Sequence, residues 1–219
     1  IKMTLVILDE MGVETKFEDN VIRVLPLSNQ VSKTFTVESD WSSASYYYSI
    51  LALSPVGTQI DLSDYKSESL QGDAVLRNIY KKLGVESSFS GTILSLKKVQ
   101  RPLPACLALD LSDAPDIAQT IVVSCLGLEI DCDLTGLHTL KIKETDRLLA
   151  LKNEIKKLGT ELKITDNSLH LNNVASLNCG VHIATYDDHR MAMAFAPLAL
   201  RASLYIENAE VVSKSYPCL

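Results

Sequence analysis

Three stretches of the chain share one pattern of apolar and polar positions. They start at Gly12, Gly84 and Gly159 and read GVETKFEDNVIRVLP, GVESSFSGTILSLKK and GTELKITDNSLHLNN, at intervals of 72 and 75 residues. In each stretch, two short segments alternate apolar with polar side chains around a turn at Asp-Asn or Gly. Such alternation predicts a β-hairpin with one buried face and one face in water. We therefore expect a threefold internal repeat.

A helical pattern precedes each of the three glycines. The helical stretches are residues 3–11, 74–83 and 146–158. Glycine readily takes the left-handed conformation that follows the last turn of many helices, so its position here has a physical reason. Each repeat is therefore predicted to contain a helix followed directly by a hairpin.

A second series of helices recurs in phase with the hairpins. Residues 40–53, 116–128 and 188–200 each start with an aspartate and continue as almost unbroken apolar runs. An aspartate at a helix start accepts hydrogen bonds from unpaired backbone N–H groups, so all three are expected to cap their helices. Helices that are apolar all round must be buried all round. The pattern thus predicts an α/β fold with helices at the centre and sheets outside. If the helices are parallel, their N-termini together attract anions.

Composition narrows the classes of function. The 219 residues are 47% apolar, enough for one large core or two smaller ones. A net charge of −6 and the lack of a basic stripe argue against a nucleic-acid partner. No apolar run is long enough to span a membrane. Five cysteines without a CxxC pair favour a reducing, cytoplasmic location. Because the sequence starts at Ile1 in mid-pattern, we expect a fragment.

Two charged segments are candidates for chemistry. In Lys143-Glu144-Thr145-Asp146-Arg147, a helix covering the whole segment would bring Lys143 and Arg147 to one face. The alternative is a solvated helix start, neutralised by the acidic residues between them. In the second segment, Arg190 leads into a very apolar helix, where a buried guanidinium needs an anionic partner. That partner is either a neighbouring aspartate, Asp187 or Asp188, or a bound anion.

Other positions carry less information on their own. His189 reads as a satisfied core histidine, Asp116 as a helix cap, and Lys214 as an ordinary lysine. Ser42, Ser43 and Ser45 indicate an N-cap cluster, because no GxSxG motif surrounds them. No zinc-ligand spacing or glycine-rich phosphate loop is present in the sequence, so we expect no metal and no cofactor.

Five motifs in order change this interpretation. Between residues 39 and 217 the chain contains, in this order, SDWSSASYYYS, PDIAQT, LKIKETDRL, ATYDDHRMAMAFA and VVSKSYP. Their succession resembles the 5-enolpyruvylshikimate-3-phosphate synthases among the enolpyruvyl transferases, and the resemblance covers essentially the whole chain. The resemblance implies two globes, each an inside-out α/β barrel of repeated units. Residues 1–36 would finish the first globe and residues 37–219 would form most of the second. The missing amino-terminal half of the same enzyme is then a required partner.

The resemblance also implies a reaction and a site. The enolpyruvyl group of phosphoenolpyruvate passes to the 5-hydroxyl of shikimate 3-phosphate, with release of phosphate, in aromatic amino-acid biosynthesis. Asp116 and Lys143 would bind the shikimate ring, with Asp116 helping to deprotonate the hydroxyl. Glu144 would protonate phosphoenolpyruvate, which requires a pKa raised by burial. The phosphoenolpyruvate anion would be held by Arg147, Arg190 and Lys214.

The sequence differs from the family pattern at two places, and two alternative functions compete with this expectation. Thr139, preceded by His138, stands where many members carry Asn against the shikimate phosphate, which leaves that contact open. The ending YPCL is also shorter than is usual in the family. The rivals are a UDP-N-acetylglucosamine enolpyruvyl transferase and a noncatalytic relative with the same fold. The fragment alone is expected to be inactive and to self-associate through uncovered apolar surface.

Overall fold

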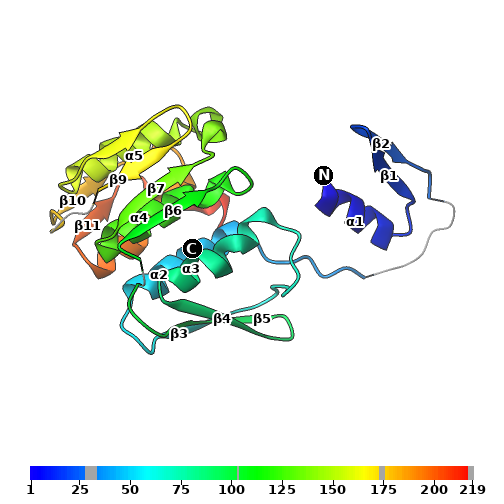
Figure 1. Ribbon diagram of the computed structural model, residues 1–219, viewed down its shortest axis with the longest axis horizontal. Helices are drawn as coiled ribbons and strands as arrows, with labels where there is room; N and C mark the ends of the chain where they lie inside the picture. Colours follow the sequence, from blue (N-terminus) through cyan, green and yellow to red (C-terminus); the bar gives the residue numbers. More distant parts are fainter. Residues whose placement is uncertain (28–33, 103, 173–175, 217–219) are drawn as a thin grey trace.

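The computed structural model describes residues 1–27, 34–102, 104–172 and 176–216. Figure 1 shows the order and arrangement of the elements. The α-helices are α1 (Lys2–Glu10), α2 (Trp41–Leu53), α3 (Leu76–Lys82), α4 (Ala118–Leu128), α5 (Arg147–Lys157) and α6 (His189–Phe195). Short 3₁₀ helices are η1 (Gly72–Val75), η2 (Pro115–Ile117), η3 (His138–Ile142), η4 (Ala196–Leu200) and η5 (Ala209–Lys214). Pro217 of the final motif, and Cys218 and Leu219 of the ending YPCL, lie outside the described residues.

The strands of the described residues form four separate sheets. They are β1 (Thr15–Glu18), β2 (Val21–Val24), β3 (Gln59–Leu62), β4 (Val85–Ser90), β5 (Ile93–Lys98), β6 (Cys106–Asp110), β7 (Asp131–Thr135), β8 (Leu162–Ile164), β9 (Leu169–Leu171), β10 (Val181–Ile183) and β11 (Leu204–Ile206). The strand orders are β1-β2, β3-β5-β4, β6-β7-β9-β8 and β10-β11. The pairs β6-β7 and β10-β11 are parallel, whereas the other pairs are antiparallel.

All three predicted hairpins are present. They are β1-β2, β4-β5 and β8-β9, each antiparallel. The glycine before each hairpin has a positive φ, +84° at Gly12 and Gly84 and +100° at Gly159, as expected after a helix end. At Gly84 a side chain is also excluded by contact, because a Cβ there would lie 2.1 Å from the Gln100 carbonyl oxygen.

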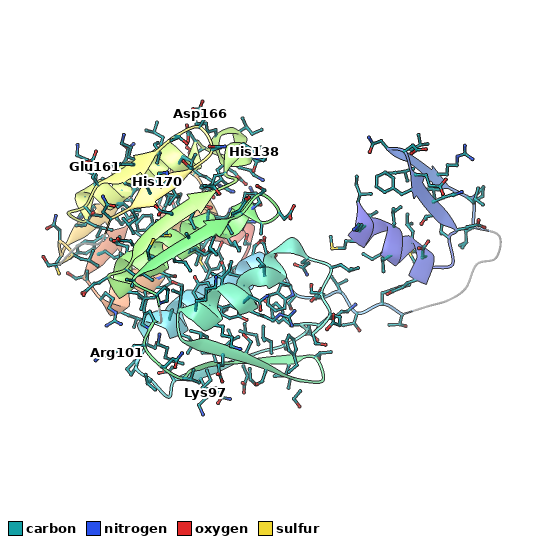
Figure 2. The ribbon with its side chains drawn as sticks, viewed as in Figure 1. Lys97, Arg101, His138, Glu161, Asp166 and His170 are labelled. Carbon is teal, nitrogen blue, oxygen red and sulfur yellow. The ribbon has the colours of Figure 1, made fainter. Side chains whose placement is uncertain are left out.

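The predicted alternation of the hairpins is confirmed in two of them. Leu94 and Leu96 of β5 are fully buried, and Leu169 of β9 is buried while the neighbouring His170, labelled in Figure 2, is 41% exposed. The first hairpin differs from the prediction. Phe17 is 42% exposed and Val24 is 52% exposed, because in the described chain α1 alone makes more than marginal contact with this hairpin.

The apolar helices lie at the centre, as predicted. Ten of the 13 residues of α2 and ten of the 11 residues of α4 are buried. Ser45 contacts Thr120 at 3.1 Å, and one turn further along both helices Ser49 contacts Ser124 at 2.8 Å. Because the contacts advance together, α2 and α4 run in the same direction. Figure 1 shows the sheets outside these helices.

The described chain falls into two parts. The buried core cluster starts at Trp41 and includes residues from every later α-helix. The amino-terminal unit, which consists of α1, β1 and β2, contributes nothing to this core and lies apart from the other elements in Figure 1. We call residues from α2 onward the main body. Within the described residues, no helix is long and apolar enough to cross a membrane.

Candidate active site

Seven charged side chains meet at the starts of the buried helices. We call them the charged cluster: Asp116, Lys143, Glu144, Arg147, Asp188, Arg190 and Lys214. Asp116 lies in η2, just before α4, while Asp188 and Arg190 open α6. The cluster therefore includes six of the seven residues expected to bind or react, brought together from positions up to 98 residues apart.

Arg147 is the centre of the charged cluster. Its side chain is 1% exposed, and its Nε donates to Asp188 Oδ2 at 2.6 Å. One terminal nitrogen donates to Asp116 Oδ1 at 3.0 Å, and the other donates to Glu144 Oε2 at 2.7 Å. The solvated helix start considered for this segment is therefore wrong for Arg147, which is buried, although Glu144 neutralises it as that alternative expected. A guanidinium suits this position because its N–H groups fan out toward several carboxylates in one plane.

Lys143 and Arg147 do not share a helix face. Helix α5 begins only at Arg147, where Asp146 caps it by accepting from the Leu149 N–H at 3.0 Å. Lys143 is extended and lies before the helix. Both cations nevertheless reach the same carboxylate, because Lys143 Nζ lies 3.2 Å from Asp116 Oδ1.

The prediction that each leading aspartate caps its helix is wrong for Asp116. Asp40 accepts from the Ser42 N–H and Asp188 from the Arg190 N–H, as expected. Asp116 makes no capping bond, and its carboxylate faces Lys143, Arg147 and Arg190 instead. Charge-assisted bonds to cations are stronger than bonds to neutral N–H groups, so the carboxylate turns toward the cations.

Arg190 has the longest, and so the weakest, ion pair of the four cations in the cluster. Its side chain is 17% exposed, and its ion pair with Asp116 is long, at 3.6 Å. Neither Asp187 nor Asp188 pairs with its guanidinium among the described residues, although Asp188 does pair with Arg147. Burial opposes the charge on Arg190, but Tyr46, Asp116 and Asp73 outweigh burial and raise its pKa. The guanidinium is thus charged, only loosely held, and open to an added anion.

Glu144 is held ionised, contrary to expectation. Lys214 Nζ lies 2.6 Å from Glu144 Oε1, and this bond lowers the pKa of the carboxyl group to about 2 against the opposing effect of burial. Arg147 adds to the shift through its charge. The raised pKa that a general acid needs is therefore not a property of this arrangement, and Glu144 would have to lose its contact with Lys214 first.

Two further residues near the cluster behave differently from the predictions. Thr139 was expected in the site, but it is not part of the charged cluster. Its buried Oγ1 has no hydrogen-bond partner among the described residues. His189 is not a satisfied core histidine, since its Nδ1 lies 3.8 Å from Asp188 Oδ1 without a hydrogen bond. Burial lowers the pKa of His189, which favours its neutral form.

The sequence did not point to Asp73. Its carboxylate accepts a bond from the Ser42 hydroxyl, burial raises the pKa of Asp73, and Arg190 is close enough to lower it. Asp40 caps α2, while Ser42 and Ser43 bind carboxylates, so the serines are not the cap cluster that we predicted. Only the position of Asp73 after Gly72, at the start of a helical stretch, hinted at its location. Asp73 and Asp116 line a hollow of about 450 Å³ together with residues 1–3 of the amino-terminal unit.

The charged cluster suits binding of an anion rather than of a metal. It combines four cations with three carboxylates at the starts of parallel buried helices, where helix dipoles add positive potential. Within the described residues, no group of His, Cys, Asp and Glu side chains is arranged to hold a metal ion. The fold and the charged cluster together define a class of protein. Its members are α/β proteins with buried central helices, and lysine and arginine side chains lie at the N-termini of these helices.

Comparisons with known proteins identify the family. Residues 1–219 match the model of the EPSP synthase (3-phosphoshikimate 1-carboxyvinyltransferase) family, and the chain belongs to this family. A 3-phosphoshikimate 1-carboxyvinyltransferase of Bacteroides fragilis is 43% identical over 99% of the chain, and one of Clostridioides difficile is 32% identical over 99%. The chain covers 53% and 49% of these relatives, so it spans about half their length.

A solved structure supports the fold independently. An EPSP synthase from Acinetobacter baumannii aligns with 96% of the chain and 51% of its own length, with a TM-score of 0.77. At 22% identity this likeness concerns the fold alone. The predicted inside-out α/β architecture, with buried helices and outer sheets, is confirmed.

Proposed function

We propose that the chain provides one half of an enzyme that transfers the enolpyruvyl group of phosphoenolpyruvate to the 5-hydroxyl of shikimate 3-phosphate. The observation that carries this proposal is the charged cluster. Four cations and three carboxylates converge within ion-pair distance on a family scaffold. Both proposed substrates are anions, and the chemistry needs an acid and a base close to them.

Asp116 and Lys143 form the acceptor side of the proposed site. Asp116 accepts the proton of the 5-hydroxyl as the hydroxyl oxygen attacks, and Lys143, whose Nζ lies 3.2 Å from Asp116 Oδ1, binds the shikimate ring beside it. We place Thr139 near the phosphate of shikimate 3-phosphate, because its buried hydroxyl has no other bond among the described residues. A hydroxyl can donate one hydrogen bond to a phosphate oxygen.

Arg190 and Lys214 form the donor side. Arg190 has one long contact, so its planar fork remains available for the carboxylate or phosphate of phosphoenolpyruvate. We also assign Arg147 to this side. Its four bonds to carboxylates mean that it reaches a ligand only if one carboxylate gives way, and otherwise it positions Asp116 and Glu144.

Glu144 acts as the general acid once Lys214 turns to the phosphoenolpyruvate anion. Without that cation the pKa of Glu144 rises, so the carboxylate can take up a proton from water and pass it to the methylene carbon of phosphoenolpyruvate. The adjacent carbon becomes electron-poor and is attacked by the 5-hydroxyl oxygen, whose proton goes to Asp116. Loss of phosphate and return of one methyl proton to the Glu144 carboxylate then restore the carbon–carbon double bond, now as that of an enol ether. No cofactor takes part.

The remaining proposals concern the whole enzyme. We assign residues 1–36 to a first globe and residues 37–219 to most of a second, because the buried core starts only at Trp41. The proposed partner is the amino-terminal half of the same enzyme, which would cover the exposed face of β1-β2. We place the enzyme in the cytoplasm, with neither a nucleic-acid nor a membrane partner.

Phosphate release by the full-length enzyme tests the function. The wild type is compared with Glu144→Gln and Arg190→Ala, using phosphoenolpyruvate with shikimate 3-phosphate or with UDP-N-acetylglucosamine. We expect release with shikimate 3-phosphate alone, reduced at least about a hundredfold in both variants. Release with only the UDP-sugar would support the sister transferase. No release from a folded enzyme with either acceptor would support the noncatalytic relative. Turnover by the 219-residue chain alone would contradict the need for its partner half.

A further inference from the structure

A second group of cations lies at the other end of the buried helices. Lys98, Arg101 and Arg201 line a pocket of about 250 Å³ beside the last residues of α2 and α4. Arg101 and Arg201 also line an adjoining pocket of about 250 Å³. We call this region the basic pocket. The 11 residues of α4 separate it from the charged cluster by about 16 Å.

The basic pocket is a different place from the charged cluster. In Figure 2, Arg101 lies at the opposite end of the main body from His138, which opens the short helix leading to Lys143. The two groups of cations share no residue. An anion at one group therefore leaves the other accessible.

Lys98 is an unusual lysine because it is buried without a carboxylate partner. The residue is 3% exposed, and its Nζ donates to the Leu83 carbonyl oxygen at 2.8 Å. Burial, reinforced by the charge of Arg201, lowers the pKa of Lys98 to about 8. A buried ammonium with a guanidinium neighbour is costly unless an anion joins them.

The surrounding protein balances only part of this charge. Within the described chain, no carboxylate oxygen comes within 4.0 Å of the charged nitrogens of Lys98, Arg101 or Arg201. Glu129 lines the adjoining pocket and offsets one of the three charges at longer range. The Leu83 carbonyl oxygen, at the end of α3, accepts one hydrogen bond from Lys98. No such carbonyl bond to Arg101 or Arg201 is present in the described chain.

We propose that the basic pocket is a second anion site that binds a dianionic phosphate group, either free phosphate or the head of a small phosphomonoester. Three cations and one carboxylate leave an excess of two positive charges, which a dianion matches. Arginine forks bind phosphate oxygens in pairs, and Lys98 adds a point charge at the bottom of the pocket. The adjoining pocket leaves room for the organic part of an ester.

Phosphate titration of site-specific variants tests this assignment. Binding of inorganic phosphate and of glycerol 3-phosphate is followed by calorimetry in wild type, Arg201→Gln, Arg190→Gln and Lys97→Gln. Lys97 is the matched control, because it is exposed on β5 next to Lys98 and does not line the pocket. We expect one binding event to weaken about tenfold in Arg201→Gln while persisting in Arg190→Gln and Lys97→Gln. Loss of all binding in Arg190→Gln, or unchanged binding in Arg201→Gln, would overturn the proposal.

Proton uptake supplies a second readout. In the Arg190→Gln protein at pH 8, an anion beside Lys98 favours its charged form, so binding takes up a fraction of a proton. Titrations in two buffers of different ionisation enthalpy measure this fraction. Lys98→Met should abolish the uptake while leaving the chain folded, because Met is apolar and of similar length. Binding without uptake in the Lys98 protein would contradict contact between phosphate and Lys98. A stronger signal with glycerol 3-phosphate than with phosphate would identify an ester as the ligand.

Discussion

Arg147 and Asp188 form a buried ion pair across 41 positions of sequence, with Nε and Oδ2 2.6 Å apart. Neither side chain is more than 1% exposed. The pair joins the first turn of α5 to the N-cap of α6, and so ties together the segments that carry Lys143 and Arg190 of the charged cluster. The cluster is therefore held together by a contact that a ligand does not need to supply.

Breaking this pair should strongly destabilise the chain. Asp188→Asn leaves the Arg147 charge buried with only part of its partners, so the free energy of unfolding should fall by about 3–5 kcal/mol. Urea denaturation followed by circular dichroism measures the change. Lys16→Met is the control, because the Lys16–Glu18 pair is mostly exposed on both sides and should contribute less than about 1 kcal/mol. Equal effects of the two substitutions would contradict the role of Arg147 as a buried centre.

The ionisation of Glu144 should depend on Lys214. In Lys214→Met the pKa of Glu144 should rise from about 2 toward its ordinary value of 4.5, because the largest cause of the shift is removed. Carbon-13 NMR titration of the glutamate carboxyl groups detects the change. A lowered pKa stabilises the folded chain at pH values above 4.5, and this contribution disappears as the pH falls toward 2. Lys214→Met should therefore flatten the acid side of the stability curve, whereas the exposed control Lys141→Met should leave Glu144 unchanged.

Lys98 predicts a pH dependence on the alkaline side, with the same sign as that of Glu144. Its pKa is lowered from 10.5 in the unfolded chain to about 8, so folding disfavours its charged form. Between pH 8 and pH 10.5 the unfolded chain binds more protons at this residue, and stability gained from its deprotonation rises with pH. Compared with Lys98→Met, the wild type should gain at most about 1.4 kcal/mol per pH unit over this range. A constant difference between the two proteins from pH 7 to pH 10 would rule out the lowered pKa.

Two glycines with positive φ should tolerate alanine very differently. At Gly84 a Cβ would meet backbone atoms of Gln100 at 2.1 Å, whereas at Gly91 nothing lies within 4 Å. Gly84→Ala should cost about 3 kcal/mol or more, because the backbone has to move, and Gly91→Ala about 1 kcal/mol. Thermal unfolding of both variants compares the two costs. Similar melting temperatures would show that conformation alone, not the close approach of Gln100, fixes Gly84.

The proposed boundary near residue 36 can be tested by deletion. Removing residues 1–36 takes away exposed apolar side chains, including Phe17, Ile22 and Val24, but no member of the buried core cluster. We expect residues 37–219 to keep a cooperative unfolding transition and to self-associate less than the 219-residue chain. Sedimentation velocity compares the two proteins. Loss of the unfolding transition on deletion would place the boundary elsewhere.

Local patterns predicted the elements well because they depend on neighbouring residues. Alternation around Gly91 and around Asp166-Asn167 located two hairpins, and all-apolar runs located α2 and α4 at the centre. The alternation of β1-β2 predicted an apolar face but not whether this chain covers it. The face is exposed because burial depends on what packs there, and the pattern of one strand pair contains no such information.

The charged cluster was harder to predict, because its bonds join distant positions. Sequence neighbours suggested Asp187 or Asp188 for Arg190, yet Asp188 pairs with Arg147, and Arg190 faces Asp116 instead. The predicted direction of the Glu144 pKa shift was wrong for the same reason. The prediction considered burial but not Lys214, which lies 70 residues further along the chain. The motifs indicated which residues take part, and folding decided which of them pair.

The span of these contacts has a kinetic consequence. The charged cluster closes loops between positions 116, 144, 188 and 214, so it cannot form until α4, α5, α6 and η5 have all docked. Contacts of such high sequence separation form late, after the entropy of closing their loops has been overcome. A partly folded chain can already contain its hairpins and still lack the cluster entirely. Anion binding at the charged cluster would then report complete folding, because the chain acquires it in a single step at the end of folding.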